Sequence, residues 1–281
     1  MKGHIRERGP GRWAIILDIR DPVTGKRRRR WHSFSGGKRE AQIECARLVS
    51  ALTGGTYIDP SKITLAVHLE RWLEHVQTLI SPKTYERYCG VVRGNIIPAL
   101  GAVLLTKLQP VQISGMYAKA LAGGRRDGKG GLSGASVLYM HRLLKEALKA
   151  AVQGWRLLPW NPADAVKAPI AKRKKLRALD TTETAELLEA ARPYRLFIPV
   201  LLAITAGLRR GEICSLRWRH VDLSGGQLAV TGSTEQTKAG TREKDTKSGR
   251  ARTVALAAIA LKELRRHKLR QAEELLQFGV R

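Results

Sequence analysis

The chain has 281 residues, with 51 Lys and Arg against 24 Asp and Glu, and carries a formal net charge of +27. An excess of this size is typical of proteins that bind a polyanion, so nucleic acid is the favoured partner, ahead of an anionic membrane surface or of basicity for solubility alone. No apolar run reaches about 18 residues, which excludes a helix that spans a bilayer. Residues 1–20 hold no apolar h-region before a small-residue cleavage site, so we expect no secretory signal.

The cysteines indicate a reduced environment. Cys45, Cys89 and Cys214 are scattered, odd in number and without metal-ligand spacing. We therefore expect a cytoplasmic protein with no metal and no other cofactor. The length allows two or three small domains.

Residues 1–58 predict a very small fold of three strands and one helix. Apolar residues alternate with more polar ones from Trp13 to Ile19, which predicts a half-buried strand. Turn residues follow it. The expected elements are a strand at 13–20, a turn at 21–25, strands at 26–31 and 32–34, and a helix at 38–52.

Four consecutive arginines on the second strand are the most informative feature of this module. Alternate residues of a strand point to opposite faces, so two arginines lie on each face. One interpretation is a solubilising edge strand. The overall charge favours the other, a sheet laid in the major groove of DNA. The candidate DNA-binding residues here are Arg27, Arg28, Arg29, Arg30 and Lys38.

Residues 62–168 predict an all-helical bundle. Thr64 is a plausible N-cap, and Pro82 occupies the first turn of the next helix. Two further helices are expected at 108–122 and 132–154. Near the start of the second helix, Lys83, Thr84 and Arg87 are candidates for phosphate contacts, although a solvated face explains each of them equally well. The neighbouring Tyr85 and Tyr88 are interpreted as core residues rather than as base-stacking ones.

Residues 176–281 follow a basic linker and predict a third, mainly helical module. Asp180 and Glu183 form a capping-box pattern ahead of one helix. The remaining expected elements are a helix at 196–204, a hairpin whose strands lie at 227–230 and 251–256, and a charged helix at 257–276.

The stretch 205–213, Thr-Ala-Gly-Leu-Arg-Arg-Gly-Glu-Ile, is the most informative in the chain. Gly207 can end the preceding helix through a left-handed cap. A new helix then begins at or beside Arg209 and continues to Trp218, so its free backbone N–H groups and a guanidinium face the same point, an arrangement that suits a phosphate. A helix–turn–helix corner with a solvated arginine pair explains the stretch equally well.

This stretch resembles the first conserved box of the tyrosine recombinases, the integrases of phages and integrative elements. The resemblance runs along nearly the whole chain and implies a multidomain α+β fold. It implies an arm-site DNA-binding domain (1–58), a core-binding helical domain (62–168) and an incomplete, mainly helical catalytic domain with a β-hairpin (176–281). Its implied partner is double-stranded DNA at arm-type and core-type sites, with self-association on the DNA. Replacing Arg28 and Arg30 would then remove arm-type binding more than core-type binding.

The resemblance also implies a chemistry. In the family, a tyrosine attacks a DNA phosphorus and forms a 3′-phosphotyrosyl link without a metal, while cationic side chains stabilise the transition state. Arg209 matches the first arginine, and Glu212 matches the carboxylate that orients it. Lys247 best matches the hairpin lysine that protonates the departing 5′-oxygen, and Lys244 is a second alignment.

The family's second box, His-x-x-Arg, and its nucleophilic tyrosine are not found. All six tyrosines precede Arg209. His267 and Arg270 have the right spacing, but they fall in the helix that the family places before the second box. We therefore expect a truncated integrase of a mobile element that binds DNA without cleaving it. A non-catalytic regulator or competitor at integrase sites is the alternative, and a non-specific RNA-binding protein ranks last.

Overall fold

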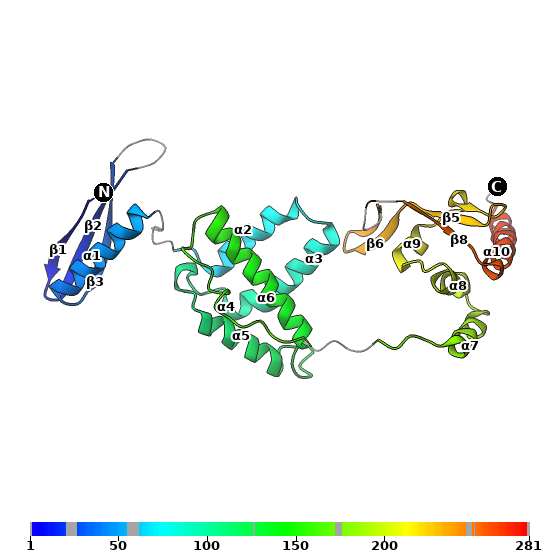
Figure 1. The fold of residues 1–281 in the computed structure, drawn as a ribbon, viewed down its shortest axis with the longest axis horizontal. Coiled ribbons are helices and arrows are strands. Elements are labelled where there is room, and N and C mark those ends of the chain that lie inside the picture. Colours follow the sequence, from blue (N-terminus) through cyan, green and yellow to red (C-terminus); the bar gives the residue numbers. More distant parts are fainter. Residues whose placement is uncertain are drawn as a thin grey trace. The chain divides into compact units, whose positions relative to one another are not determined.

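The computed structural model describes residues 2–20, 27–54, 62–125, 127–171, 176–245, 249 and 251–279 (Figure 1). The chain divides into two compact units, one built mainly from residues 1–172 and the other mainly from residues 173–281. Helices and antiparallel strands together make a mixed α+β fold, as the sequence predicted. Within the described residues, no helix is both long and apolar enough to cross a membrane.

An antiparallel sheet of three strands, in the order β1-β2-β3, opens the first unit, and one helix packs on it. Its small core joins Ile15 and Leu17 of the central strand to Cys45 and Leu48 of the helix. The elements are β1 (Lys2–Gly9), β2 (Arg12–Arg20), β3 (Arg27–Ser35) and α1 (Lys38–Thr53).

The composition of this sheet differs from the expectation. The strands expected at 26–31 and 32–34 are one strand, β3. The third strand is β1, whose single aliphatic side chain, Ile5, gives no alternating pattern; it is held by its backbone pairing with β2. The expected turn at 21–25 lies outside the described residues.

The helical part of the first unit has the expected helices. The Thr64 side chain accepts a hydrogen bond from the Val67 amide and caps α2 as predicted. Pro82 begins α3. Fully buried aliphatic side chains such as Leu69 and Leu144 fill the interior. The elements are α2 (Leu65–Gln77), α3 (Pro82–Val91), a π-helical turn (Val92–Ile96), α4 (Ile97–Leu100), a 3-10 turn (Leu105–Lys107), α5 (Pro110–Gly123), α6 (Gly134–Lys149) and a second π-helical turn (Ala150–Gly154).

His68 is the fully buried polar residue of this part. Its Nε2 lies 2.9 Å from the Ala147 carbonyl oxygen, its Nδ1 has no hydrogen-bond partner, and the ring meets the edge of Trp155. Burial lowers the pKa of His68. The ring is therefore neutral in the folded chain at a pH where an unfolded His68 is already protonated.

We expect the free energy of unfolding to fall as the pH drops through about 6.5, the ordinary pKa of histidine. Below that pH, His68 binds a proton in the unfolded chain but stays neutral in the folded chain, so acid favours unfolding. Urea unfolding of the wild type and of His68→Gln between pH 7.5 and 5 measures the effect. An equally steep pH dependence in both chains would contradict it.

In its described residues, the second unit combines four α-helices after residue 176 with two small antiparallel sheets. The predicted pairing of the strand at 227–230 with the one at 251–256 is confirmed, and β4 extends it to the order β4-β5-β8. Its core packs Leu201, Leu202 and Leu264 against Leu228 and Val230. The elements are α7 (Thr181–Ala191), α8 (Phe197–Thr205), α9 (Arg210–Ser215), a 3-10 turn (Trp218–His220), β4 (Val221–Asp222), β5 (Gln227–Val230), β6 (Ser233–Thr237), β7 (Gly240–Lys244), β8 (Arg252–Ala255) and α10 (Ala258–Gln277).

Two features of this unit were not expected. The polar segment between the paired strands forms a second hairpin, β6–β7, that the sequence did not predict. The helix after Arg209 ends at Ser215 instead of continuing to Trp218. The Ser215 hydroxyl donates to the Glu212 carbonyl, a local bond that competes with helix continuation, and Leu216 is extended.

Candidate nucleic-acid interface

The loop between α8 and α9 exposes Arg209 and the adjacent Arg210 and buries Leu208. Gly207 has φ of +62°, which ends α8 through the left-handed conformation that the sequence predicted. Leu208 is buried in the core and anchors the loop. Arg209 is the N-cap of α9, and its side chain is 71% exposed.

Glu212 holds this loop from below. Its carboxylate is 3% exposed and accepts from the Arg209 backbone N–H at 2.9 Å and from Arg209 Nη1 at 3.1 Å. Arg252 of β8 donates through Nη1 at 2.9 Å to one carboxylate oxygen and through Nη2 at 2.8 Å to the other. One buried carboxylate thus joins two guanidiniums from segments 40 residues apart.

Electrostatics keep this carboxylate charged. The hydrogen bonds from Arg252 in the first place, and those from Arg209, lower the pKa of Glu212 to about 2, although burial opposes them. The same pairing raises the pKa of Arg252. The bond to the Arg209 amide also corrects one expectation, because that N–H is taken by Glu212 and is not free for a phosphate.

Gly211 allows β6 to approach this loop. A Cβ at this position would lie 2.4 Å from Ser233 Oγ and 2.7 Å from the Thr234 backbone oxygen. Because backbone cannot move aside as a flexible side chain can, a larger residue would push β6 away from α9. Each named residue of the spacing Gly-Leu-Arg-x-Gly-Glu therefore has its own structural role. Gly207 makes the turn, Leu208 anchors the loop in the core, and Arg209 is exposed. Gly211 allows close packing against β6, and the buried Glu212 binds two arginines.

The two candidate lysines have different outcomes. Lys247 lies outside the described residues. Lys244 ends β7, and its ammonium pairs with Glu235 of β6, whose side chain is 9% exposed. Lys244 therefore stabilises its own hairpin, and its ammonium is already engaged.

Arg252 is the member of this cluster that sequence reasoning missed. It lies in the strand expected at 251–256, yet nothing local marks it among the arginines of this basic region. The register of β5 and β8 opposes Val230 to Arg252. Its contact with Glu212 joins segments 40 residues apart, which no local spacing relates.

The register of the N-terminal sheet shows on which face of the sheet each of the four consecutive arginines lies. Directly opposed residues of antiparallel strands share a face. Arg28 opposes Ile19 and Arg30 opposes the buried Leu17, so both lie on the face that α1 covers. Arg27 and Arg29 lie on the open face.

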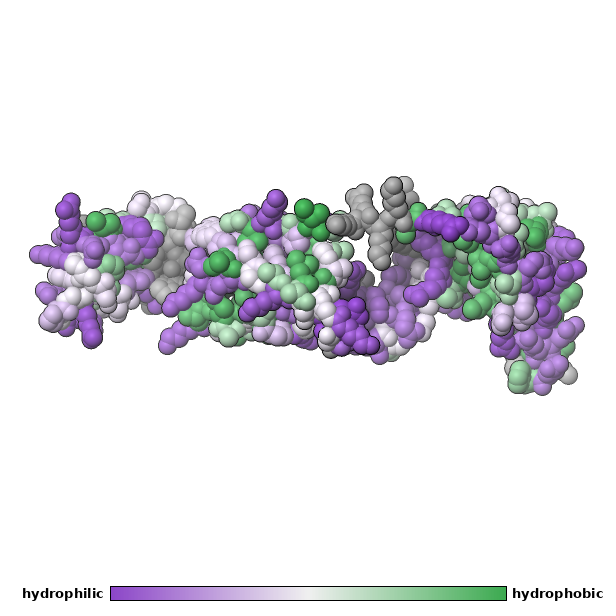
Figure 2. Space-filling view, turned by 90° about the horizontal axis from the view of Figure 1, so that it is seen from below, coloured by the Kyte–Doolittle hydropathy of each residue, from purple (hydrophilic) through white to green (hydrophobic). Residues whose placement is uncertain are grey.

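The open face combines cations with an exposed indole. Arg29 pairs with Asp18 at 3.3 Å, and the Arg8 guanidinium lies 5.1 Å from the centre of the Trp31 ring. Hydrophilic residues cover much of the N-terminal sheet and its helix in the view of Figure 2. All four arginines are exposed, so their contact with an arm-type site stays a prediction for both faces.

The other predicted contacts lie on α1 and α3, and those on α3 have contacts within the protein. Lys38 is the exposed first residue of α1. Lys83 pairs with Glu86 at 3.2 Å, and Thr84 Oγ1 lies 2.9 Å from Ser81 Oγ. The Arg87 guanidinium lies 4.1 Å from the centre of the Tyr139 ring. Their contact with DNA stays a prediction.

Tyr85 and Tyr88 are half-buried, and α3 contributes no buried residue, so the prediction that both are core residues does not hold in full. The Tyr88 ring stacks on the buried Trp72 with centroids 5.8 Å apart, and it meets Tyr139 edge-on. This packing occupies the Tyr88 face that a base would need for stacking.

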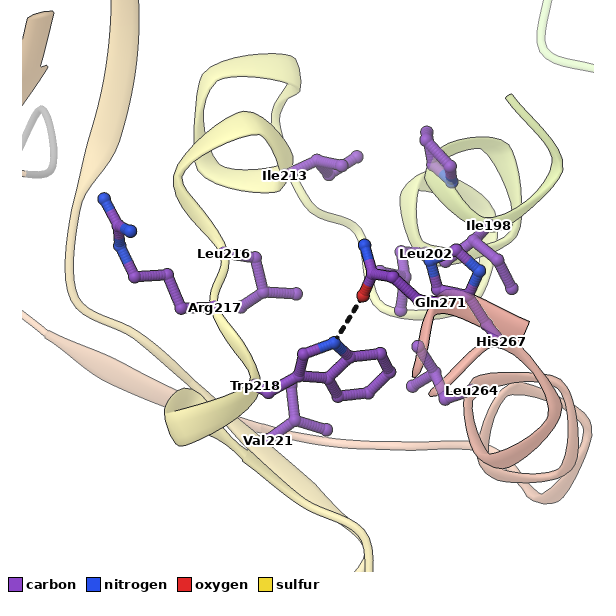
Figure 3. A pocket seen from close by; sticks show the side chains of 11 residues that line it. Ile198, Leu202, Ile213, Leu216, Arg217, Trp218, Val221, Leu264, His267 and Gln271 are labelled. Carbon is purple, nitrogen blue, oxygen red and sulfur yellow. Dashed lines mark hydrogen bonds between the residues drawn. The ribbon is translucent and has the colours of Figure 1, made fainter. Parts of the chain in front are cut away.

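A pocket of about 240 Å³ lies between α8, α10 and the segment that follows α9 (Figure 3). Trp218 Nε1 donates to Gln271 Oε1 at 2.6 Å across its floor, and His267 lines it from α10. Burial lowers the pKa of His267. His267 and Arg270 thus belong to the helix that the sequence predicted for them.

Among the described residues, no group of three or more His, Cys, Asp or Glu side chains is placed to hold a metal ion.

Comparison with known families gives two matches. The phage integrase family matches residues 177–277, and the N-terminal SAM-like domain of phage integrases matches residues 64–121. The first match contains the Arg209, Glu212 and Arg252 cluster.

Individual relatives agree with these matches. A tyrosine recombinase XerC-like protein of Caldanaerobacter subterraneus subsp. tengcongensis is 26% identical over 261 residues, which cover 86% of this chain and 64% of that protein. The chain therefore spans less than two thirds of that relative's length.

Solved structures show the same fold. The Tn1549 transposon integrase in complex with a circular intermediate DNA superposes with a TM-score of 0.61 at 15% identity, over 73% of this chain and 64% of that one. A lambda integrase dimer bound to a COC′ core site superposes with a TM-score of 0.50 at 25% identity, over 86% and 65%.

Proposed function

Because the chain belongs to the phage integrase family of tyrosine recombinases, we propose that residues 1–281 bind double-stranded DNA at the sites of a mobile element's integrase. In this proposal the sheet of residues 1–58 binds arm-type sites. Residues 62–168 and 176–281 bind core-type sites, and the chain self-associates on DNA. The net charge of +27 supports a polyanionic partner.

The Arg209 side chain carries the proposal. Its guanidinium is 71% exposed yet fixed at its base by a buried carboxylate. A planar guanidinium held in this way can donate two parallel hydrogen bonds to a phosphate and loses little conformational freedom on binding. We propose that Arg209 binds the core-site phosphate at the position where the family cleaves DNA, and that Lys247 contacts the same phosphodiester.

The chemistry of strand cleavage is proposed to be absent from these residues acting alone. Phosphoryl transfer requires a nucleophile in line with the leaving oxygen. No tyrosine follows Arg209, so no candidate matches the family's nucleophile. The proposal is DNA binding without cleavage, and its alternative is a regulator or competitor that occupies integrase sites.

We expect the purified chain to retain duplexes from a random-sequence library, and Arg209→Gln to weaken binding to the selected duplex about tenfold, the effect of one charge-assisted contact. Fluorescence anisotropy measures both affinities. Arg195→Gln is the matched control, since that side chain is 94% exposed and lies in the same unit. An equal effect of both substitutions would contradict the assignment of Arg209.

The same duplex, nicked next to the bound phosphate as a suicide substrate, tests cleavage. We expect no protein–DNA adduct on a denaturing gel. A covalent adduct would show that another side chain acts as the nucleophile and would overturn the proposal of binding without cleavage.

A further inference from the structure

Arg252 and Arg209 share one carboxylate unequally. Arg252 places Nη1 and Nη2 on the two oxygens of Glu212, at 2.9 and 2.8 Å, as a fork. The Arg209 guanidinium uses a single side-chain donor, Nη1, at 3.1 Å. The fork geometry is the stronger of the two arrangements.

The charges of the cluster do not cancel. Two guanidiniums and one carboxylate leave one positive charge, and exposure decides where an anion can reach it. The Arg209 side chain is 71% exposed, the Arg252 side chain 38%, and the Glu212 side chain 3%. The uncompensated charge is therefore most accessible at Arg209.

We propose that Arg252 is a positioning residue that occupies the Glu212 carboxylate so that the Arg209 guanidinium stays free to bind a DNA phosphate. Without Arg252, both carboxylate oxygens would be open to the neighbouring Arg209. That guanidinium would then fold onto Glu212 as a neutral pair. The inference rests on the proposed DNA binding and adds to it a role for a side chain that does not itself touch the phosphate.

A double-mutant cycle in DNA affinity tests this role. Wild type, Arg209→Gln, Arg252→Gln and the double variant are titrated against the selected duplex by anisotropy, below the melting transition of each chain. We expect Arg252→Gln to weaken binding nearly as much as Arg209→Gln, about tenfold, and the double variant to be no weaker than either. Arg252→Lys, which restores the charge but not the fork, should fall between wild type and Arg252→Gln.

Additive losses would overturn the inference, because they would mean that Arg252 contacts DNA itself or acts only through stability. An unchanged affinity in Arg252→Gln would also overturn it. Arg195→Gln serves again as the control for a general loss of positive charge.

A measurement without DNA separates this inference from the proposed function. Phenylglyoxal modifies accessible guanidiniums, and peptide mass spectrometry reports the modification rate of Arg209. We expect the rate to fall several-fold in Arg252→Gln and to stay unchanged in Arg195→Gln. An unchanged rate at Arg209 would overturn the positioning role, whereas a failure of the wild type to bind any duplex would overturn the proposed function alone.

Discussion

Replacing Glu212 with glutamine is expected to lower the free energy of unfolding of the C-terminal unit by about 1.5–3 kcal/mol, the range for a hydrogen bond to a charged group, because the guanidiniums that lose their anion are 71% and 38% exposed. The carboxylate is 3% exposed and accepts bonds from Arg209 and from both Nη atoms of Arg252. Glutamine keeps the shape but turns an amide donor toward a guanidinium donor and leaves two cations without their anion. Urea unfolding followed by circular dichroism measures the loss.

Glu243→Gln is the matched control. Glu243 also pairs with an arginine, Arg217, but both side chains are more than half exposed, at 57% and 54%. An exposed pair of this kind contributes about 0–1 kcal/mol. Equal losses in the two variants would show that the Glu212 cluster is not a buried ion pair in solution.

The pH dependence gives the same cluster a second signature. The pKa of Glu212 is lowered to about 2 in the folded chain, against 4.5 ordinarily. Its contribution to stability is therefore present above pH 4.5 and is lost as the pH falls toward 2. In Glu212→Gln this part of the acid dependence should disappear, while the loss through pH 6.5 that arises from His68 should remain.

Local sequence rules predicted the helices because several begin with a recognisable cap and others carry an apolar stripe. Thr64, Pro82 and the Asp180 capping box begin helices where expected. The same rules missed β1, β6 and β7, whose residues are mostly polar. Backbone hydrogen bonding to a neighbour holds such strands, and that pairing has no periodic signal in one sequence.

The candidate site also has residues that local sequence rules predict and one that they do not. Gly207, Arg209 and Glu212 lie within six residues of each other, so turn chemistry and helix capping could place them. Arg252 of β8 reaches Glu212 of α9 from 40 residues away in the sequence, and its place depends on the pairing of β8 with β5. Interactions of this kind follow from tertiary structure and are not visible in residue spacing.

The open face of the N-terminal sheet is expected to contribute to the salt dependence of DNA binding. The helix α1 packs on the face that carries Arg28 and Arg30, although all four arginines are exposed. We propose that the opposite face, with Arg27 and Arg29, lies in the groove. Arg29 on that face pairs with Asp18 at 3.3 Å in an exposed bond, which a phosphate can replace at little cost.

We expect the affinity of the whole chain for its selected duplex to fall by roughly 10³- to 10⁵-fold between about 50 and 200 mM salt, as for proteins with six to ten phosphate contacts. Each contact contributes about −0.9 to the slope of log affinity against log salt, so replacing Arg27 and Arg29 with alanine should make the slope less steep by nearly two. Replacing Arg28 and Arg30 changes the net charge equally but removes side chains from the helix-covered face, so its slope should stay close to wild type. Anisotropy titrations across this salt range compare the two pairs. A flat salt response would contradict binding through phosphates, and equal slopes in the two double variants would mean that the sheet does not use its open face.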